Sequence, residues 1–115
     1  MRTLVGITVM SDADKLLLRK VKDAILGFIA TAEVLLYGSV ARGDQDADSD
    51  YDILVLTETP LTLRQEDAIR DAVYDVQLAS GVVISTMFYS KGEWETDFVR
   101  ASPLYGEILR DGVLL

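Results

Sequence analysis

The sequence predicts an α/β (α+β) fold: one domain, residues 1–115, in which helices flank a small mixed β-sheet. Strand-like apolar runs are interspersed with amphipathic helical patterns along the chain, and no repeat or Pro/Gly/Ser-rich linker interrupts them. A length of 115 residues allows one hydrophobic core but not two. The turn between the first two strong strands is too short for a long crossover, so we expect a mixed sheet rather than a uniformly parallel one.

The first third of the chain predicts a long helix. Residues 1–10 alternate poorly, which suits a short strand or an irregular arm. Ser11 or Asp12 can cap a helix that we expect from Ala13 to Ala30. Its expected buried stripe is Leu16, Leu17, Val21, Ala24, Ile25, Phe28 and Ile29. The basic residues of this helix fall largely off the stripe, so a solvated face is favoured over a phosphate contact.

Two apolar runs predict the central strands. Glu33–Tyr37 is almost wholly apolar, as is typical of a strand buried on both faces. Asp52–Thr57 is the second run, and Pro60 ends it. A third strand, Val82–Tyr89, is rich in β-branched and aromatic residues.

Capping patterns place the remaining helices. Thr62 with Gln65 forms a capping box for a helix that Gly81 closes. The expected buried stripe of that helix is Ile69, Ala72, Val73, Val76 and Ala79. Ser90 with Glu93 forms a second capping box. We expect Trp94 and Phe98, four residues apart, to pack the short helix that follows onto the sheet.

The C-terminal segment predicts one more helix and a tail. Ser102–Pro103 has the form of an N-cap and first helical residue. The apolar positions of this helix are Leu104, Ile108 and Leu109, and Gly112 stops it. Residues 113–115 are expected to form an exposed or docking tail. This tail, together with Tyr105, could serve an interface, although an ordinary core edge is the favoured interpretation.

Composition excludes several classes of chemistry. The chain has no cysteine and no histidine, so disulfides, thiol nucleophiles, zinc–thiolate sites and imidazole bases are absent. Acid–base or metal chemistry must therefore use carboxylates. The net charge of −8 and the lack of a basic patch argue against a long nucleic acid as substrate. No signal peptide or membrane-spanning segment is recognisable, so we expect a cytoplasmic protein that does not bind a membrane.

The segment from Leu35 to Leu56 carries the candidate site. Gly38 lets a ligand approach the backbone, and Ser39 offers a hydroxyl and an amide at the start of a helical turn, where anions are favoured. Arg42 adds a charge with a geometry suited to phosphate. Asp50 and Asp52 share one strand face, about 7 Å apart along the chain. Two carboxylates this close repel each other unless a cation such as Mg²⁺ or Mn²⁺ sits between them.

This pattern resembles the nucleotidyltransferase domain of the DNA polymerase beta-like superfamily. The signature is Gly-Ser, Ala-Arg-Gly and Ser-Asp-x-Asp, here Gly38–Ser39, Ala41–Gly43 and Ser49–Asp52. The resemblance covers nearly the whole chain and is greatest to the minimal, single-domain branch, the antitoxin-like partner of helical HEPN proteins. The alternative is an acidic hairpin loop in which these two aspartates, Asp50 and Asp52, cap turns and Gly43 allows a positive φ.

The resemblance implies a fold, a reaction and a partner. The fold is the nucleotidyltransferase fold, and the reaction transfers a nucleoside monophosphate from a nucleoside triphosphate, which we expect to be ATP, to an acceptor hydroxyl. Gly38, Ser39 and Arg42 are implied to bind the phosphates, and Asp50 and Asp52 to be the catalytic metal ligands. The acceptor is implied to lie on a partner protein of the HEPN type, as in toxin–antitoxin pairs.

One position departs from the family pattern. Active relatives carry a third carboxylate on the next long strand, in a Gly-x-Asp-x-Ser pattern, and the sequence here is Gly81-Val82-Val83-Ile84-Ser85. Val83 cannot bind a metal. Glu93 and Glu95 are candidate substitutes that fit better as surface residues, and Ser85 could hold a water molecule. The alternative function is therefore a nucleotide-binding antitoxin or partner-binding module with weak or no catalysis.

Overall fold

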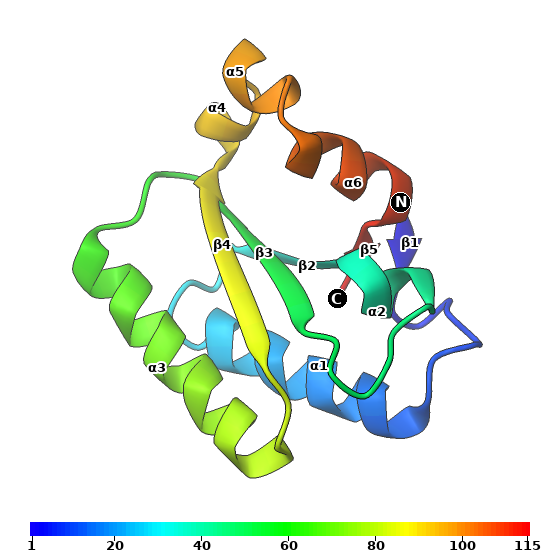
Figure 1. The fold of residues 1–115 in the computed structure, drawn as a ribbon. Coiled ribbons are helices and arrows are strands. Elements are labelled where there is room, and N and C mark those ends of the chain that lie inside the picture. Colours follow the sequence, from blue (N-terminus) through cyan, green and yellow to red (C-terminus); the bar gives the residue numbers. More distant parts are fainter.

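The computed structural model describes residues 1–115 and shows a five-stranded sheet with helices on both faces (Figure 1). The strands are β1 (Arg2–Thr3), β2 (Glu33–Tyr37), β3 (Tyr51–Thr57), β4 (Ile84–Ser90) and β5 (Val113–Leu114), in the order β1-β5-β2-β3-β4. Strand β2 runs antiparallel to β3 and β5, whereas the β3–β4 and β1–β5 pairs are parallel. The predicted mixed sheet is confirmed.

The helices are α1 (Asp12–Leu26), α2 (Gly38–Arg42), α3 (Leu63–Ser80), α4 (Lys91–Trp94), α5 (Asp97–Arg100) and α6 (Pro103–Asp111). Both predicted capping boxes form. The Thr62 hydroxyl accepts from the Gln65 amide at 3.1 Å, and the Ser90 hydroxyl accepts from the Glu93 amide at 3.1 Å. None of the six helices combines the length and the apolar character that crossing a membrane requires.

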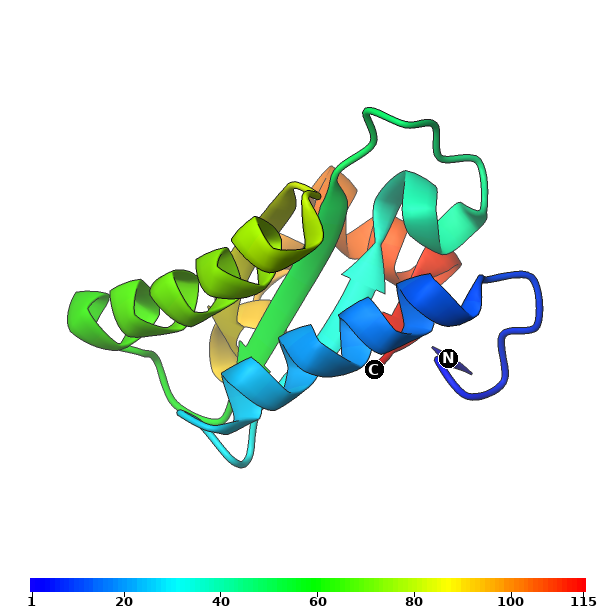
Figure 2. The same cartoon turned by 90° about the horizontal axis from the view of Figure 1, so that it is seen from below.

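Helices α1 and α3 cover one face of the sheet and enclose the larger core (Figure 2). Their buried side chains meet the alternate residues of β2 and β3 that point to this face, among them Leu36, Ile53 and Val55. Fully burying one such aliphatic side chain stabilises the fold by roughly 1.5–3 kcal/mol. The completely buried members of this core include Leu18, Val21, Ile25, Leu36, Ile53, Val55, Ile69 and Val113.

The buried face of α1 differs from the apolar stripe that the sequence predicts. The helix ends at Leu26, and Gly27 caps it, so Phe28 lies beyond its end and is half-exposed. Leu16 is also half-exposed, on the groove that α1 forms with the end of α3, while Leu18 is fully buried instead. The predicted stripe is thus wrong at Leu16 and Phe28. The buried face of α1 is centred on Leu18, Val21 and Ile25, and Leu16 lies off this face because two residues turn a helix by about 200° from Leu18.

The smaller core lies on the opposite face, beneath α4, α5 and α6. Trp94 is its centre, with its ring 5.6 Å from that of Tyr89 and 5.1 Å from that of Tyr105. Tyr105 is therefore part of a core edge. The expectation that Phe98 packs onto the sheet is wrong, because its side chain is 88% exposed. Thr96 caps a new helix after Trp94, and this turn brings Val99 inward in place of Phe98.

The predicted tail is in fact a strand. Residues 113 and 114 form β5, which lies between β1 and β2. Val113 is completely buried opposite Leu36, whereas Leu109, expected to be apolar contact surface of α6, is 67% exposed. The pairing partners of β5 lie far away in the sequence, so its local pattern does not reveal them.

Candidate active site

The predicted Gly–Ser turn and one predicted aspartate meet at the end of β2. Gly38 has φ 78°, a left-handed conformation that favours glycine, and starts α2 directly after the strand. A Cβ atom on Gly38 would overlap Oδ2 of Asp52 and stand 3.2 Å from its Cγ. The carboxylate of Asp52 therefore lies directly against the backbone of the turn, and only glycine leaves room for it.

Strand register explains this meeting. Tyr37 pairs with Asp52 across the antiparallel β2–β3 ladder, so the residue after Tyr37 lies beside the aspartate. Strand β3 begins at Tyr51, one residue earlier than predicted, and Asp50 is exposed immediately before it. The Tyr51 hydroxyl donates to Asp14 Oδ1 at 2.6 Å, and its amide donates to the Val83 carbonyl at 2.9 Å. These two bonds fix the start of the strand between the aspartates.

Negative charge concentrates at this point. The pKa of Asp52 is raised, first because the carboxyl group is half-buried, and then because Asp50 and Glu107 repel its ionised form. Arg42 opposes this rise only partly. The pKa of Tyr37 is raised to about 12, chiefly by burial and then by Asp52 and Glu107.

This donor set fits a divalent cation. The available ligands are carboxylate oxygens, which hard ions such as Mg²⁺ prefer, and a cation there would relieve the repulsion between them. The structure brings no group of three or more acidic side chains together closely enough to hold a metal ion. Asp50 and Asp52, which repel each other, therefore do not form a complete metal-binding cage with a third acidic side chain.

Ser39 and Arg42 flank this pair on α2. Ser39 is half-buried, and its hydroxyl makes no hydrogen bond within the protein, while its carbonyl accepts from Gly43 and Asp44 at 3.0 and 3.1 Å. Arg42 lies in the last turn of α2. Its guanidinium pairs with Asp44 at 3.2 Å and with Asp111 at 3.7 Å. These pairs engage Nε and Nη1, so Nη2 of Arg42 is the guanidinium nitrogen that remains free for a phosphate.

The polar side chains of the acidic loop before β3 bond mostly to other groups of the same loop. Oδ1 of Asp46 accepts from the Asp48 amide at 2.8 Å and from the Ser49 hydroxyl at 3.3 Å. The Ser49 hydroxyl in turn accepts from the Asp46 amide at 2.9 Å. Asp44 binds Arg42. The alternative interpretation assigns a turn-capping role to Asp50 and Asp52, but Asp46 is the aspartate of this segment that caps a turn.

The β3–β4 register shows which residues of the neighbouring strand face the pair. Ser85 pairs with Asp52, and Val83 lies two residues earlier, just before β4, with half of its side chain exposed. Alternation along the strand puts Val83, Ser85 and Met87 on one face. This face of β4 carries no carboxylate at these three positions.

Glu93 and Glu95 do not replace the missing carboxylate. Glu93 Oε1 accepts from the Ser90 amide at 3.0 Å, and Glu95 forms an ion pair with Arg100. Ser90 pairs with Thr57, five residues along β3 from Asp52, a distance of roughly 17 Å by strand rise. Both glutamates make their contacts around α4 and α5, at the end of the sheet that is far from Asp52.

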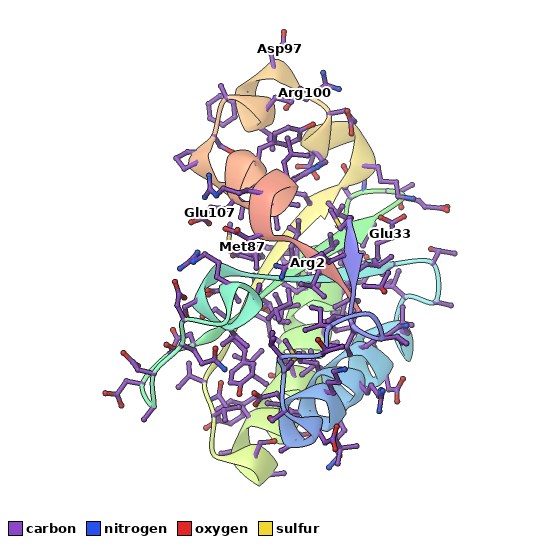
Figure 3. All side chains as sticks on the ribbon, turned by 90° about the vertical axis from the view of Figure 1, so that its right-hand side faces the viewer. Arg2, Glu33, Met87, Asp97, Arg100 and Glu107 are labelled. Carbon is purple, nitrogen blue, oxygen red and sulfur yellow. The ribbon has the colours of Figure 1, made fainter.

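Glu107 is an acidic neighbour that sequence reasoning missed. It is half-buried on α6, and its charge contributes to the raised pKa of both Tyr37 and Asp52. Figure 3 labels its side chain on α6. The sequence signal that could have found Glu107 is its position directly before Ile108, which is buried. This position puts Glu107 at the margin of the apolar face of α6.

The pair lies on an open surface rather than in a deep pocket. Two hollows of about 250 and 380 Å³ adjoin the acidic loop, and both are lined by Val40 and Gln45. Neither is lined by Gly38, Ser39, Asp50 or Asp52. Asp50 is exposed, and Asp52 is half-buried.

Sequence and structure comparisons place the chain in a family and a fold. The family model of the nucleotidyltransferase domain matches residues 15–109. A candidate protein adenylyltransferase of Methanocaldococcus jannaschii is 36% identical over 73 residues, which span 64% of this chain and 73% of the relative. A crystal structure described as a toxin–antitoxin with AMP-PNP superposes with a TM-score of 0.59 at 18% identity, over 84% of this chain and 69% of that chain. The last similarity shows a shared fold.

Proposed function

The chain belongs to the nucleotidyltransferase domain family, and from this premise we propose that it transfers a nucleoside monophosphate from ATP to a hydroxyl group of a partner protein. The observation that carries the proposal is the contact between the Asp52 carboxylate and the Gly38 turn. It brings a half-buried carboxylate next to the backbone groups of Gly38 and Ser39 at the start of α2. Phosphate binding and charge neutralisation are thereby combined in one place.

The position of each residue determines its role in the proposed reaction. Gly38 and Ser39 hold the triphosphate, assisted by Arg42 through the free Nη2 of its guanidinium. Asp50 and Asp52 hold Mg²⁺ or Mn²⁺, which neutralises charge on the phosphate oxygens. The acceptor oxygen bonds to the α-phosphorus as the bond from that phosphorus to the bridging oxygen of pyrophosphate breaks. Pyrophosphate leaves and the hydroxyl proton passes to solvent.

A protein acceptor is favoured over other hydroxyl donors. Asp50 is exposed, and the net charge of −8 opposes a long nucleic acid. The archaeal relative is named for protein adenylylation, and the structural neighbour is described as a toxin–antitoxin. We propose that the acceptor is a helical, HEPN-type toxin protein.

A second candidate function is nucleotide binding without efficient transfer. The face of β4 that lies beside Asp52 carries Val83, Ser85 and Met87. A third carboxylate at one of these positions would complete a metal site. Such a domain would act by occupying its partner rather than by modifying it. Transfer of label from ATP distinguishes the two functions, since only the first leaves the partner covalently modified.

Calorimetric titration with ATP, with and without Mg²⁺, tests the proposed site. We expect measurable binding only with Mg²⁺, and loss of that binding in Asp50→Asn and Asp52→Asn. Asp48→Asn is the matched control, since this loop aspartate is exposed and its carboxylate makes no bond within the protein. Equal affinity with and without Mg²⁺ contradicts a metal-bridged site. Incubation of the protein and its chromosomal neighbour with labelled ATP and Mg²⁺ then tests the transfer itself.

A further inference from the structure

We propose that the outer edge of β4 binds an extended, basic segment of a partner protein, which adds to the sheet as one more antiparallel strand. The binding surface is the edge of β4 together with the hollow between β4 and α3, and we call it the β4 groove. Only β4 separates this surface from β3, the strand that carries Asp52. Binding there requires neither ATP nor a metal ion.

Strand β4 is the long open edge of the sheet. It ends the strand order, whereas β1 at the other margin has only two residues. Folded proteins usually protect such an edge with a charged side chain, a proline or a bulge. Residues 84–90 contain no charged residue and no proline, and their pairing with β3 is continuous. The edge is therefore available to another strand.

Alternation along β4 turns the backbone groups of every second residue outward. The Val83 carbonyl accepts from the Tyr51 amide at 2.9 Å. In a parallel pair with this register, the odd-numbered residues of β4 direct their N–H and C=O groups to β3. The even-numbered residues, from Ile84 to Ser90, therefore direct theirs away from the sheet.

Side chains satisfy the outward amides at the two ends of β4. The Ile84 amide donates to Gln77 Oε1 at 2.9 Å, and the Ser90 amide donates to Glu93 Oε1 at 3.0 Å. These bonds confirm the outward direction of the even-numbered residues. They also limit the part of the edge that remains open to the residues between the two ends.

Thr86 and Phe88 form this open part. Both residues are half-buried, and no side chain or neighbouring strand pairs with their outward amides. Unpaired backbone groups that are partly removed from water are unfavourable. An added strand accepts from both amides and donates to both carbonyls, and it leaves the bonds of Gln77 and Glu93 in place. The open groups therefore fit a short extended segment.

Helix α3 forms a wall beside this edge. A hollow of about 300 Å³ lies between α3 and β4, and its lining includes Asp71, Tyr74, Ile84 and Thr86. The side chain of Tyr74 is half-exposed there. Paired residues of antiparallel strands point to the same face of a sheet, so a residue of the segment that pairs with Thr86 directs its side chain into this hollow.

The charges of the wall favour a basic segment. The Arg70 guanidinium lies over the Phe88 ring and already pairs with Glu66 and Asp67, at 3.9 and 3.5 Å. Asp71 is exposed and forms no ion pair, so it is the charge of the wall that lacks a partner. A lysine of the segment can lay its apolar stem along the hollow and bring its ammonium group to Asp71. The net charge of −8 attracts the same kind of segment.

A single segment fits this edge better than a second copy of the chain. In Figures 1 and 2 the first turns of α3 project past the sheet on the side of β4. Antiparallel pairing of two β4 strands would bring both projecting helices onto the same face of the joined sheet. Two chains of net charge −8 also repel each other. An extended basic segment avoids both costs.

A peptide of alternating valine and lysine, as long as β4, tests the proposal by calorimetry and by hydrogen exchange followed by NMR. We expect it to bind without ATP or Mg²⁺. At saturation, exchange of the Thr86 and Phe88 amides should slow by about tenfold or more, because each gains a hydrogen bond. Exchange at Ile84, whose amide is already bonded to Gln77, should change little.

Two methylated peptides separate strand addition from general attraction of charge. In an antiparallel addition the lysines that share the face of Thr86 direct their backbone groups to β4. N-methylation of the lysines removes the donors that face the edge and should abolish binding. N-methylation of the valines leaves those donors and should preserve it.

Variants of the protein test the same contacts from the other side. Thr86→Pro removes one outward amide and spares the bonds to β3, so it should weaken binding about tenfold, whereas Thr86→Val keeps the amide and serves as its control. Asp71→Asn should also weaken binding. Asp97→Asn is its control, because Asp97 is exposed on α5 and the change in net charge is the same.

The outcomes that overturn the proposal are distinct. Absence of peptide binding, or equal affinity of the two methylated peptides, overturns strand addition. Equal affinity of a peptide with glutamate in place of lysine overturns the basic segment. Sedimentation of the free protein as a dimer, with Thr86 and Phe88 already protected, assigns the edge to a second copy and overturns the proposal too. None of these results bears on the proposed transfer, which titration with ATP tests independently.

Discussion

The carboxylate of Asp52 occupies the space in which a side chain on Gly38 would begin. We therefore expect Gly38→Ala to displace the carboxylate and to abolish Mg²⁺-dependent ATP binding. The positive φ alone should lower the free energy of unfolding by about 1–2 kcal/mol. Chemical denaturation measures the stability, and calorimetry measures the binding.

Gly81→Ala is the matched control for this substitution. Gly81 has φ 73°, and a Cβ atom there meets nothing within 4 Å. It should show the cost of the left-handed conformation and normal ATP binding. Equal binding in the Gly38 and Gly81 variants would mean that Asp52 can leave the turn without loss of the site.

Neutralising Asp52 should stabilise the metal-free protein in a pH-dependent way. Its pKa is raised in the folded state, so its favourable contribution is complete below the ordinary pKa of 3.8 and is lost as pH rises through the folded-state pKa. In EDTA, Asp52→Asn should therefore melt above the wild type at neutral pH, and the difference should shrink as pH falls. Thermal melts across this range test it. An earlier melt of the variant at neutral pH would identify Asp52 as a structural cap.

A carboxylate at position 83 should strengthen the metal site. Val83 is half-exposed and shares a strand face with Ser85, the partner of Asp52. We expect Val83→Asp to increase Mg²⁺-dependent ATP affinity and transfer of label, and to melt earlier than the wild type until Mg²⁺ is added. Destabilisation that Mg²⁺ does not relieve would show that Val83 serves only in packing.

Removing the guanidinium of Arg2 should loosen α6. Arg2→Ala loses the two bonds to the carbonyls of Ala41 and Asp111, at a cost of roughly 1–2 kcal/mol in unfolding free energy. Hydrogen exchange should rise in α6 more than in α3. Arg64→Ala is the control, since this arginine is exposed and makes no bond. An equal effect of both substitutions would show that Arg2 acts only through net charge.

The parts of the fold that the sequence predicts well depend on local interactions. The boundaries of Glu33–Tyr37 and the capping boxes at Thr62 and Ser90 match the structure, because each depends on residues within a few positions. The contact between Gly38 and Asp52 follows from the pairing of two strands that adjoin in the sequence. The motif, which spans both strands, is therefore enough to predict it. Phe98 was mispredicted because the cap at Thr96 turns the chain where helical periodicity implies continuation.

The remaining features depend on residues distant in sequence. Residues 113–114 become a strand only through Arg2, Thr3, Leu35 and Leu36. Glu107 resembles any surface glutamate until α6 docks on α2 through Asp111 and Arg42. The ion pairs of Arg42 with Asp44 and Asp111 could not be predicted from the motif either. The motif alone predicts that Arg42 is free to bind a phosphate.

The position of β5 between β1 and β2 has a consequence for synthesis on the ribosome. Strand β2 has β3 on one side, but its other edge is open until residues 113–114 arrive, and β1 has no sheet neighbour before then. A nascent chain must therefore keep the backbone edge of a strongly apolar strand unpaired until Leu114 has left the exit tunnel.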